Sequence, residues 1–327
     1  MLSKISKIGI LTSGGDAPGM NAAIRSLVRS ADFNNVEIIG IKRGFQGLIE
    51  GAFEKLEMRS VSNILKTGGT FLRSARSKDF LHKKARNLAY QNLQNYGINA
   101  LVVIGGNGSL TGASIFSDEF NIPVVGIPAS IDNDVFGTDF SIGYNTALET
   151  IVESVDKIRD TASSHNRLFF IEVMGRKSGN LALSASLSTG ACFVIIPEKD
   201  FQLIDLVKRL EDNKKRNKES SIVIVAEGNN YGPSYKIAED LSKVYSAYES
   251  KVTILGHIQR GGKPSSFDRI LASQLGMAAL ESLKLKKYNT LVGLVNNTLI
   301  NSPISEVINA TNNLSNDLYR LNKIISR

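Results

Sequence analysis

The sequence predicts an α/β protein with doubly wound, mainly parallel sheets, and three observations carry this prediction. Short apolar runs alternate with longer segments of helical periodicity along the 327 residues. The apolar runs are continuous and end at Gly or Pro, which is typical of strands buried on both faces of a parallel sheet. The chain also exceeds the roughly 250–300 residues at which a single core usually stops growing, so two lobes are expected.

Two consecutive strands define the region around which function is expected, residues 99–134. The first, 100–104, runs into Gly105-Gly106-Asn107-Gly108-Ser109; the second, 123–127, runs into Pro128-Ala129-Ser130-Ile131-Asp132-Asn133-Asp134. Ligands of such sheets sit beyond the carboxyl ends of the strands. Each loop alone is most simply a tight turn or a solvated loop. Together they favour phosphoryl transfer, which needs a phosphate cradle and acids for the metal and the attacking hydroxyl.

The first strand-to-helix turn is a further candidate for anion binding. A strand at 7–13 leads through glycine-rich residues 14–21 into a helix expected at 21–31. Such a turn presents amides to a phosphate at a helix N-terminus. The turn is not Gly-x-Gly-x-x-Gly, and the next strand ends in Lys42-Arg43 instead of the acid that would hold a ribose. Both features count against a dinucleotide oxidoreductase.

The rest of the chain repeats the alternation of strand and helix. Helices are expected at 81–96, 142–162 and 267–285, and the change of lobe is expected near the start of the second of these. Further strands are expected at residues 36–41, 168–173, 193–196, 222–226, 252–255 and 291–295.

Composition and charge narrow the functional classes. The net charge of +8 invites a nucleic-acid partner, but the basic residues form no single tract, and the nearest cluster, 214–218, reads as a solvated helix end. The single cysteine, Cys192, rules out an internal disulfide and fits a reducing cytoplasm. No apolar run approaches the ~18 residues that a membrane span needs.

Taken together, these segments resemble the ATP-dependent 6-phosphofructokinases of the bacterial, allosteric type, from Ile8 to about Val295. The motifs that carry the resemblance are Leu-Thr-Ser-Gly-Gly-Asp-Ala-Pro-Gly-Met-Asn-Ala-Ala-Ile-Arg (11–25), Gly-Gly-Thr-Phe-Leu (68–72), Ile-Asp-Asn-Asp (131–134), Arg-Asp-Thr-Ala-Ser-Ser-His-Asn-Arg (159–167), Val-Met-Gly-Arg (173–176) and Leu-Gly-His-Ile-Gln-Arg-Gly-Gly (255–262).

The resemblance implies two Rossmann-like lobes, each a three-layer α/β/α arrangement, with the active site in the cleft between them. Residues 1–140 plus about 256–300 would form the nucleotide-binding lobe. Residues 141–255 plus about 301–327 would form the sugar-phosphate-binding lobe. The implied reaction is phosphorylation of D-fructose 6-phosphate by ATP with Mg²⁺ as cofactor, in a cytoplasmic homotetramer.

Site residues follow from the same resemblance. Asp132 would be the general base for the sugar's 1-hydroxyl, beside Ser130, where the family usually has threonine; Asp134 would help hold magnesium. Arg76 would neutralise charge during transfer. The implied nucleotide-binding residues are Gly15, Phe45, Arg76, Ser77, Gly106, Asn107, Gly108, Ser109 and Gly112. The implied substrate-binding residues are Ser130, Asp132, Met174, Gly175, Arg176 (also assigned to catalysis), Glu227, His257 and Arg260, with Arg167 and Lys251 from a neighbouring subunit.

An effector site for ADP or phosphoenolpyruvate between subunits is also implied. Its residues would be Arg25, Arg29, Arg59, Arg159, Arg216 and Lys218. Arg59 would stand in for an arginine expected at Met58, and Cys192 replaces the acid that usually helps bind the effector's magnesium.

Asn107 is the departure that matters most, because the family places an aspartate there, facing the magnesium of ATP. A neutral amide is a poorer magnesium ligand than a carboxylate. Arg73 and Lys177 are unusual cations that could replace part of the metal's charge. An alternative is therefore a catalytically weakened paralogue that serves as a nucleotide- or sugar-phosphate-binding regulatory subunit. A pyrophosphate-dependent enzyme is less favoured, since Gly108 and Ala129 stand where such enzymes carry an acid and a lysine.

Overall fold

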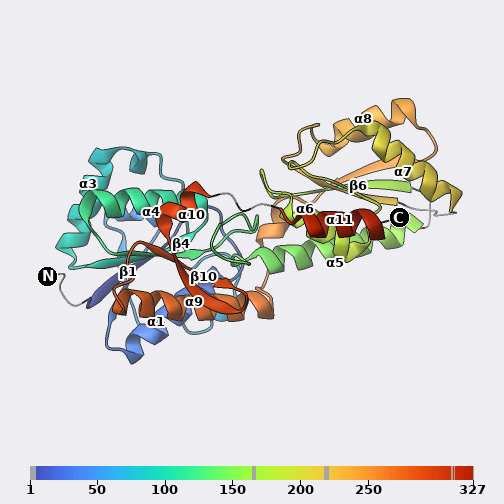
Figure 1. The fold of residues 1–327 in the computed structure, drawn as a ribbon. Helices are drawn as coiled ribbons and strands as arrows, with labels where there is room; N and C mark the ends of the chain where they lie inside the picture. Colours follow the sequence, from blue (N-terminus) through green and yellow to red (C-terminus); the bar gives the residue numbers. More distant parts are fainter. Residues whose placement is uncertain (1–4, 164–166, 217–220, 311, 313, 327) are drawn as a thin grey trace. The chain divides into compact units, whose positions relative to one another are not determined.

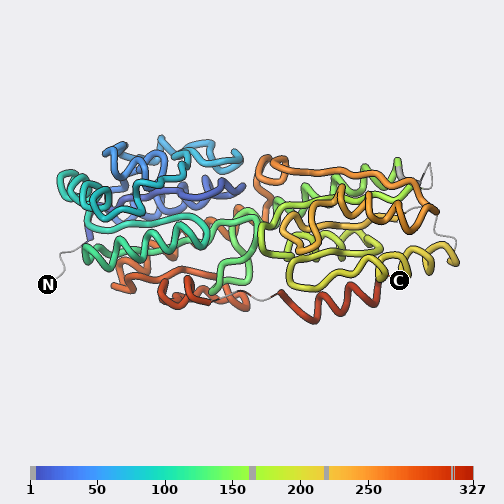
Figure 2. The backbone as a smooth tube through the Cα atoms, turned by 90° about the horizontal axis from the view of Figure 1, so that it is seen from above, coloured from blue at the N-terminus to red at the C-terminus, as the bar shows by residue number. Residues whose placement is uncertain are grey.

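The chain of the computed structural model is described over residues 5–163, 167–216, 221–310, 312 and 314–326, and it divides into two units. Unit 1 comprises Met1–Ser130, Asp134–Thr146 and Arg260–Asn312. Unit 2 comprises Ile131–Asn133, Ala147–Gln259 and Asn313–Arg327. The backbone therefore passes between the units after residues 130, 133, 146, 259 and 312, a path that Figure 2 traces.

The sheet of unit 1 has seven strands in the order β11-β10-β5-β4-β1-β2-β3. Its centre is β4 (Ala100–Gly105), which pairs in parallel with β1 (Lys7–Thr12) on one side and β5 (Val124–Pro128) on the other. β4 and β5 are buried along their whole length, as their continuous apolar runs require. Because the three strands are parallel, the loops that follow them leave from the same edge of the sheet.

Both edges of this sheet are closed by antiparallel strands. β2 (Glu37–Ile41) and β10 (Thr290–Val295) continue the parallel order, and β3 (Phe53–Leu56) and β11 (Thr298–Pro303) then pair antiparallel with them. Residues 301–312 fall in unit 1 and not with the C-terminal segment, since β11 is hydrogen-bonded to β10.

Helices cover both faces of the unit 1 sheet, so the unit has three layers (Figure 1). α1 and α9, far apart in the sequence, pack together on one face. The other face carries α3, α4 and α10 over an apolar core that includes Val103, Leu110 and Phe116. The helical segments are α1 (Met20–Phe33), α2 (Gly44–Glu50), η1 (Ile64–Lys66), η2 (Asp79–Leu81), α3 (Lys83–Asn95), α4 (Asn107–Phe120), α9 (Ser266–Lys284) and α10 (Ile304–Asn309).

Unit 2 has a smaller, fully parallel sheet in the order β7-β8-β6-β9. Helices α7 and α8 lie on one face, and α5, α6 and α11 lie on the other (Figure 1). Leu168, Val223, Leu206 and Ile237 belong to its core. The elements are α5 (Tyr144–Ser163), β6 (Arg167–Val173), α6 (Asn180–Thr189), β7 (Phe193–Ile195), α7 (Leu203–Lys215), β8 (Ser221–Ala226), α8 (Ser234–Val244), β9 (Glu249–Ile254), η3 (Gly256–Arg260) and α11 (Asn316–Ile325).

The predicted fold class is confirmed: two α/β units carry mainly parallel sheets with helices on both faces. One local expectation was wrong. The loop expected at 105–109 is a loop only as far as Gly106, and residues from Asn107 onward form the first turn of α4. Gly106 caps that helix with an extended backbone (φ −92°, ψ −169°), which allows the helix to begin directly after the strand. Across the described parts of the chain, no helix has the length and apolar character of a membrane span.

Candidate active site

The N-terminus of α4 forms a phosphate cradle at the end of β4. The N–H groups of Ser109 and Leu110 donate to the carbonyl of Gly106 at 2.9 and 3.1 Å. The N–H groups of Asn107 and Gly108 precede the first bond of the helix and can point to a ligand. A Cβ at Gly108 would meet nothing within 4 Å, so the space on the side-chain face of this residue is open. Backbone donors and the helix dipole together favour an anion here.

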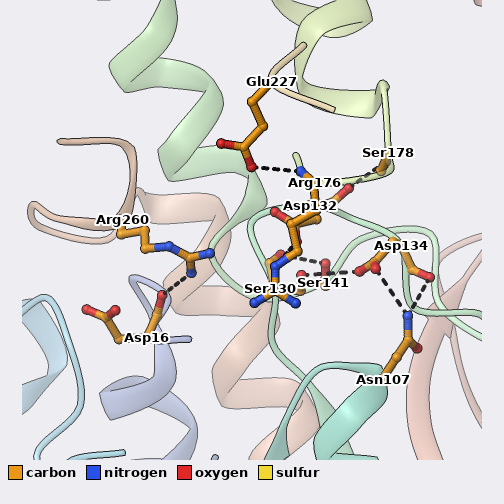
Figure 3. A network of polar contacts seen from close by, with 10 residues as sticks. All are labelled: Asp16, Asn107, Ser130, Asp132, Asp134, Ser141, Arg176, Ser178, Glu227 and Arg260. Atoms are coloured by element: carbon orange, nitrogen blue, oxygen red, sulfur yellow. Dashed lines mark hydrogen bonds and ion pairs between the residues drawn. The ribbon is translucent and has the colours of Figure 1, made fainter. Parts of the chain in front are cut away.

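The turn between β1 and α1 supplies the neighbouring backbone. Gly14 has φ +85°, a conformation that favours glycine. A Cβ at Gly15 would meet the guanidinium of Arg260, which would have to move to make room for it. Nη1 of Arg260 donates to the carbonyl of Asp16 at 3.2 Å (Figure 3). Arg260, which the resemblance assigns to the sugar phosphate, therefore lies in unit 1 against the first glycine-rich turn.

The remaining nucleotide residues divide into buried and exposed ones. Phe45 is buried and stacks on Phe80 with 4.2 Å between ring centroids, and Gly112 packs against its ring. Ser77 Oγ donates to Gln46 Oε1 at 2.7 Å. Phe45, Ser77 and Gly112 therefore shape the wall around the phosphate cradle and offer few free polar groups to a ligand. Arg76 is exposed and free to reach a ligand.

The residues expected to hold magnesium contact one another. Nδ2 of Asn107 donates to Oδ2 and to the backbone carbonyl of Asp134, both at 3.2 Å, and Ser130 Oγ donates to Oδ1 at 3.2 Å (Figure 3). Ser141 Oγ in turn fixes the Ser130 carbonyl at 2.7 Å. Within the described residues, no group of three or more His, Cys, Asp or Glu side chains could hold a metal. The single carboxylate of Asp134 fits a magnesium site in which the phosphates of a substrate supply further ligands. Proteins commonly bind magnesium in this way, through one or two carboxylates together with substrate phosphates.

Asp132 lies in unit 2 and is buried, with 4% of its surface exposed. Nε of Arg176 is 3.9 Å from its Oδ2, and Ser178 Oγ donates to its backbone carbonyl at 3.0 Å (Figure 3). The Arg176 guanidinium therefore places a positive charge beside the Asp132 carboxylate. A carboxylate held in a fixed position can serve as a general base.

The loop that follows β6 places Arg176. Its φ of +52° is uncommon for a residue with a side chain, and its N–H donates to Glu227 Oε1 at 3.0 Å. Gly228 packs directly under the carbonyl of Arg176 and leaves no room for a Cβ. The structure thus brings three predicted substrate residues together in unit 2: Asp132, Arg176 and Glu227. His257 is exposed on η3 of the same unit.

Gln259 is a residue that the sequence reasoning missed. It is fully buried, its Oε1 accepts from the N–H of Met174 at 3.1 Å, and its Nε2 donates to the carbonyl of Gly256 at 2.9 Å. The amide therefore joins the β6 loop to η3, two segments that carry predicted sugar-phosphate residues. A glutamine inside Gly-His-Ile-Gln-Arg-Gly-Gly gives no signal of burial in the sequence alone.

Arg167 and Lys251 meet on the β6–β9 pair. Both contact Glu249: Arg167 Nε lies 2.8 Å from Oε2 and Lys251 Nζ lies 2.5 Å from Oε1. These two contacts, that of Lys251 first, lower the pKa of the Glu249 carboxyl. Glu249 was also missed, although its spacing of two residues from Lys251 places both on one face of a strand.

The predicted effector residues are divided between the units. Arg25, Arg29 and Arg59 lie in unit 1; Arg159 and Arg216 lie in unit 2. Arg159 donates through Nη2 to the carbonyl of Thr189. Lys218 lies outside the described residues.

Two features of the site indicate the class of the protein, an α/β phosphotransferase. A glycine-flanked helix N-terminus follows one strand, and acidic side chains follow the next. The family model described as phosphofructokinase matches residues 7–283, and the chain belongs to this family.

Curated relatives match over nearly the full length. A Bacteroides thetaiotaomicron protein named ATP-dependent 6-phosphofructokinase 2 is 47% identical over 325 residues, covering 99% of this chain and 100% of the relative. A Staphylococcus epidermidis protein named ATP-dependent 6-phosphofructokinase is 49% identical over 324 residues, covering 98% and 100%.

Solved structures of similar fold are also named phosphofructokinases. Phosphofructokinase from Saccharomyces cerevisiae superposes with a TM-score of 0.88 at 36% identity, over 93% of this chain and 45% of that one, so this chain spans less than half of the yeast subunit. A pyrophosphate-dependent phosphofructokinase from Marinobacter aquaeolei superposes with a TM-score of 0.81 at 20% identity, covering 95% of this chain and 86% of that one. At that identity the likeness concerns the fold alone.

Proposed function

We propose that this chain is a 6-phosphofructokinase that transfers the γ-phosphoryl group of ATP to D-fructose 6-phosphate, giving fructose 1,6-bisphosphate and ADP. The observation that carries the proposal is the buried Asp132 facing Arg176, two residues along the chain from Asp134, which contacts the α4 phosphate cradle through Asn107. The relatives of 46–49% identity that are named ATP-dependent 6-phosphofructokinases support the same reaction.

In the proposed reaction Asp132 accepts the proton of the sugar's 1-hydroxyl. The oxygen of that hydroxyl forms a bond to the γ-phosphorus while the bond to the β,γ-bridging oxygen breaks, and ADP leaves with that electron pair. Arg176 lies beside the Asp132 carboxylate and would contact the substrate. The amides at Gly15, Gly106 and Gly108 take the nucleotide phosphates, and Arg76 neutralises the charge that moves to the leaving group.

Magnesium fits this arrangement through Asp134 and the phosphates of the nucleotide. When bound, the metal supplies positive charge to the transferring phosphoryl group. Asn107 can add a neutral amide oxygen, but the hydrogen bond from its Nδ2 already occupies Asp134 Oδ2. The residues present therefore support a site with one protein carboxylate, which is weaker than a site with two.

The sugar phosphate would be held by Met174, Gly175, Arg176, Glu227 and His257. Arg167 and Lys251 would reach its 6-phosphate from a neighbouring subunit of a homotetramer. In this chain both are held by Glu249, which keeps the two cations together and sets them at the end of the β6–β9 pair. The 6-phosphate, with more charge than one carboxylate, would compete with Glu249 for them.

Regulation by ADP or phosphoenolpyruvate is part of the proposal. Arg25, Arg29, Arg59, Arg159, Arg216 and Lys218 would bind the anion between subunits. Since Cys192 offers no carboxylate for a metal, a metal-free anion is favoured over magnesium-ADP. A cytoplasmic location suits these soluble phosphorylated ligands.

ATP is favoured over pyrophosphate as the donor. Gly108 carries no acid side chain, although a Cβ there would meet nothing within 4 Å, and Ala129 carries no lysine ammonium. The test is a coupled assay with fructose 6-phosphate in which ATP and pyrophosphate are compared as donors. ADP release with ATP, and none above background with pyrophosphate, is expected. Binding of both substrates without turnover would instead favour a regulatory subunit.

A further inference from the structure

A cavity of about 550 Å³ lies beside the edge strand of unit 2. β7 pairs with β8 alone among the described strands, so its outer edge has no strand partner. We call this space the β7 cavity. Its volume falls within the roughly 300–1,000 Å³ typical of small-molecule sites. It is lined by Cys192, Phe193, Val194, Ile195, Ile196, Lys199, Asp200, Phe201, Asp205, Lys208, Arg209, Asp212, Arg216, Tyr319, Asn322, Lys323 and Ser326.

The lining carries more positive than negative charge. Five cations, Lys199, Lys208, Arg209, Arg216 and Lys323, face three acids, Asp200, Asp205 and Asp212, an excess of two positive charges (5 − 3 = 2). Over the resolved ranges of the chain, none of the five forms an ion pair with a carboxylate. An excess of positive charge in the lining of a cavity raises the local concentration of anions.

Tyr319 holds two of these cations in place. The Nζ atoms of Lys199 and Lys323 lie 5.3 and 5.0 Å from its ring centroid, and Lys199 Nζ also donates to Asn316 Oδ1 at 3.0 Å. Neither contact neutralises the ammonium charge. A fixed pair of ammonium groups on one ring is suited to phosphate oxygens.

Half-buried aromatic side chains, Phe193 and Phe201, supply apolar surface in the same lining as the cations. Phe201 packs edge-to-face against Phe193 at 5.9 Å and against Tyr231 at 5.2 Å, which fixes its ring. A ring of a ligand can stack on such a surface. This combination of cations and aromatic rings suits a ligand in which a phosphate is joined to a planar ring.

We propose that the β7 cavity binds a nucleoside monophosphate or a phosphorylated compound of the same design, with its phosphate at Lys199 and Lys323. The site belongs to unit 2 alone. Of the residues assigned to the effector site between subunits, Arg216 lines the β7 cavity, as does Cys192 at the position of the effector-site acid; Arg25, Arg29 and Arg59 do not, so binding here does not require them. The inference stands independently of the proposed kinase reaction.

The test is calorimetric titration of the full chain with guanosine 5′-monophosphate, with fructose 6-phosphate and a non-hydrolysable ATP analogue present to occupy the active site. Lys199→Met/Lys323→Met should weaken binding at least about tenfold, since two charge-assisted contacts are lost. The matched control, Lys157→Met/Lys214→Met, removes two exposed helical charges outside the cavity and should bind like wild type. Arg25→Ala should also bind like wild type.

A second variant guards against misfolding of α11 in the double mutant. Lys208 is exposed on α7 with no described ion pair, so Lys208→Met leaves packing intact and should still weaken binding. The proposal is overturned if wild type does not bind the monophosphate at millimolar concentration, or if the Lys199/Lys323 and Lys208 variants bind like wild type. It is also overturned if Arg25→Ala abolishes binding, because the anion then occupies the site between subunits.

Discussion

At the scale of single residues, Asn107 couples the phosphate cradle to Asp134. A carboxylate at this position would lie beside Asp134 and repel it unless a cation stood between them. The amide instead donates to Asp134 at 3.2 Å and stabilises the pair without metal. In the proposed magnesium site, the neutral residue would give up part of the metal affinity in exchange for a site that is ordered before the metal binds.

The first prediction concerns this exchange. Asn107→Asp should lower the magnesium concentration needed for half-maximal activity and raise turnover, by up to ~10–150-fold if a charge-assisted contact of about 1.5–3 kcal/mol acts only in the transition state. Magnesium titrations followed by thermal unfolding give a readout besides activity: the variant should melt lower without metal and gain more on its addition. If the wild-type enzyme already turns over rapidly and Asn107→Asp is slower, the prediction is contradicted. Arg73 or Lys177 then supplies the positive charge that the site needs.

At the scale of elements, Gln259 joins the β6 loop to η3. Gln259→Leu leaves the buried N–H of Met174 without an acceptor and should cost about 1–3 kcal/mol of unfolding free energy. If the amide positions the sugar site, the KM for fructose 6-phosphate should rise several-fold while that for ATP stays unchanged. Gln259→Glu keeps the acceptor for Met174 and should be the milder change. Equal rises in both KM values would indicate a general loss of structure.

Arg86 and Glu119 join α3 to α4, the helix that carries the phosphate cradle. Arg86 Nε and Nη2 donate to the two carboxylate oxygens at 2.6 and 2.7 Å, while Nη1 donates to the carbonyls of Phe80 and Leu81, each at 2.8 Å. The hydrogen bonds from Arg86 lower the pKa of Glu119 below its ordinary value of 4.5. Because the pKa of Glu119 is lower in the folded state, this stabilisation is fully present above the ordinary pKa of 4.5 and is lost as the pH falls below that value and through the folded-state pKa.

Glu119→Gln should therefore destabilise the protein at neutral pH by about 1.5–3 kcal/mol, the range for hydrogen bonds to charged groups. The difference from wild type should shrink as the pH falls below about 4.5. Urea unfolding at several pH values measures the difference in unfolding free energy between the variant and wild type. If this difference stays constant with pH, the shape of the Glu119 side chain, and not its charge, stabilises the protein.

Prediction from sequence succeeded where one physical signal dominates an element. β4 and β5 are buried on both faces, so their apolar runs are continuous and their type and order could be predicted. β3 is an edge strand with one buried residue, and its Phe-Glu-Lys-Leu sequence carries no comparable pattern. The first turn of α4 was expected to be a loop because glycines flank Asn107, whereas the cap at Gly106 lets the helix start there.

The same limit applies to the site. Asp132, Arg176 and Glu227 could be proposed from motifs and are brought together in unit 2. Gln259 contacts Met174 and Glu249 contacts Arg167, residues distant in sequence, and no local pattern reveals these tertiary contacts. The position of Arg260 beside Gly15 likewise depends on the return of the chain to unit 1.

At the scale of the whole molecule, sugar binding should require the oligomer, because Arg167 and Lys251 are proposed to act on a neighbouring subunit's substrate. Dilution to monomers, followed by analytical ultracentrifugation, should abolish fructose 6-phosphate binding before nucleotide binding. Lys251→Arg should lower the KM for the sugar phosphate, since a planar fork binds phosphate in a bidentate way. Monomers that bind the sugar normally would contradict this arrangement.

The central claim is that Asp132 is the base of an ATP-dependent sugar-phosphate kinase. The most direct measurement is single-turnover transfer of ³²P from ATP to fructose 6-phosphate by wild type and Asp132→Asn, with sugar binding measured in parallel. The variant keeps the size of the side chain, so binding and folding should be nearly unchanged while the transfer rate falls by ~10²–10⁴. A variant that binds the sugar normally and transfers phosphate at close to the wild-type rate would contradict the assignment of Asp132 and the mechanism built on it.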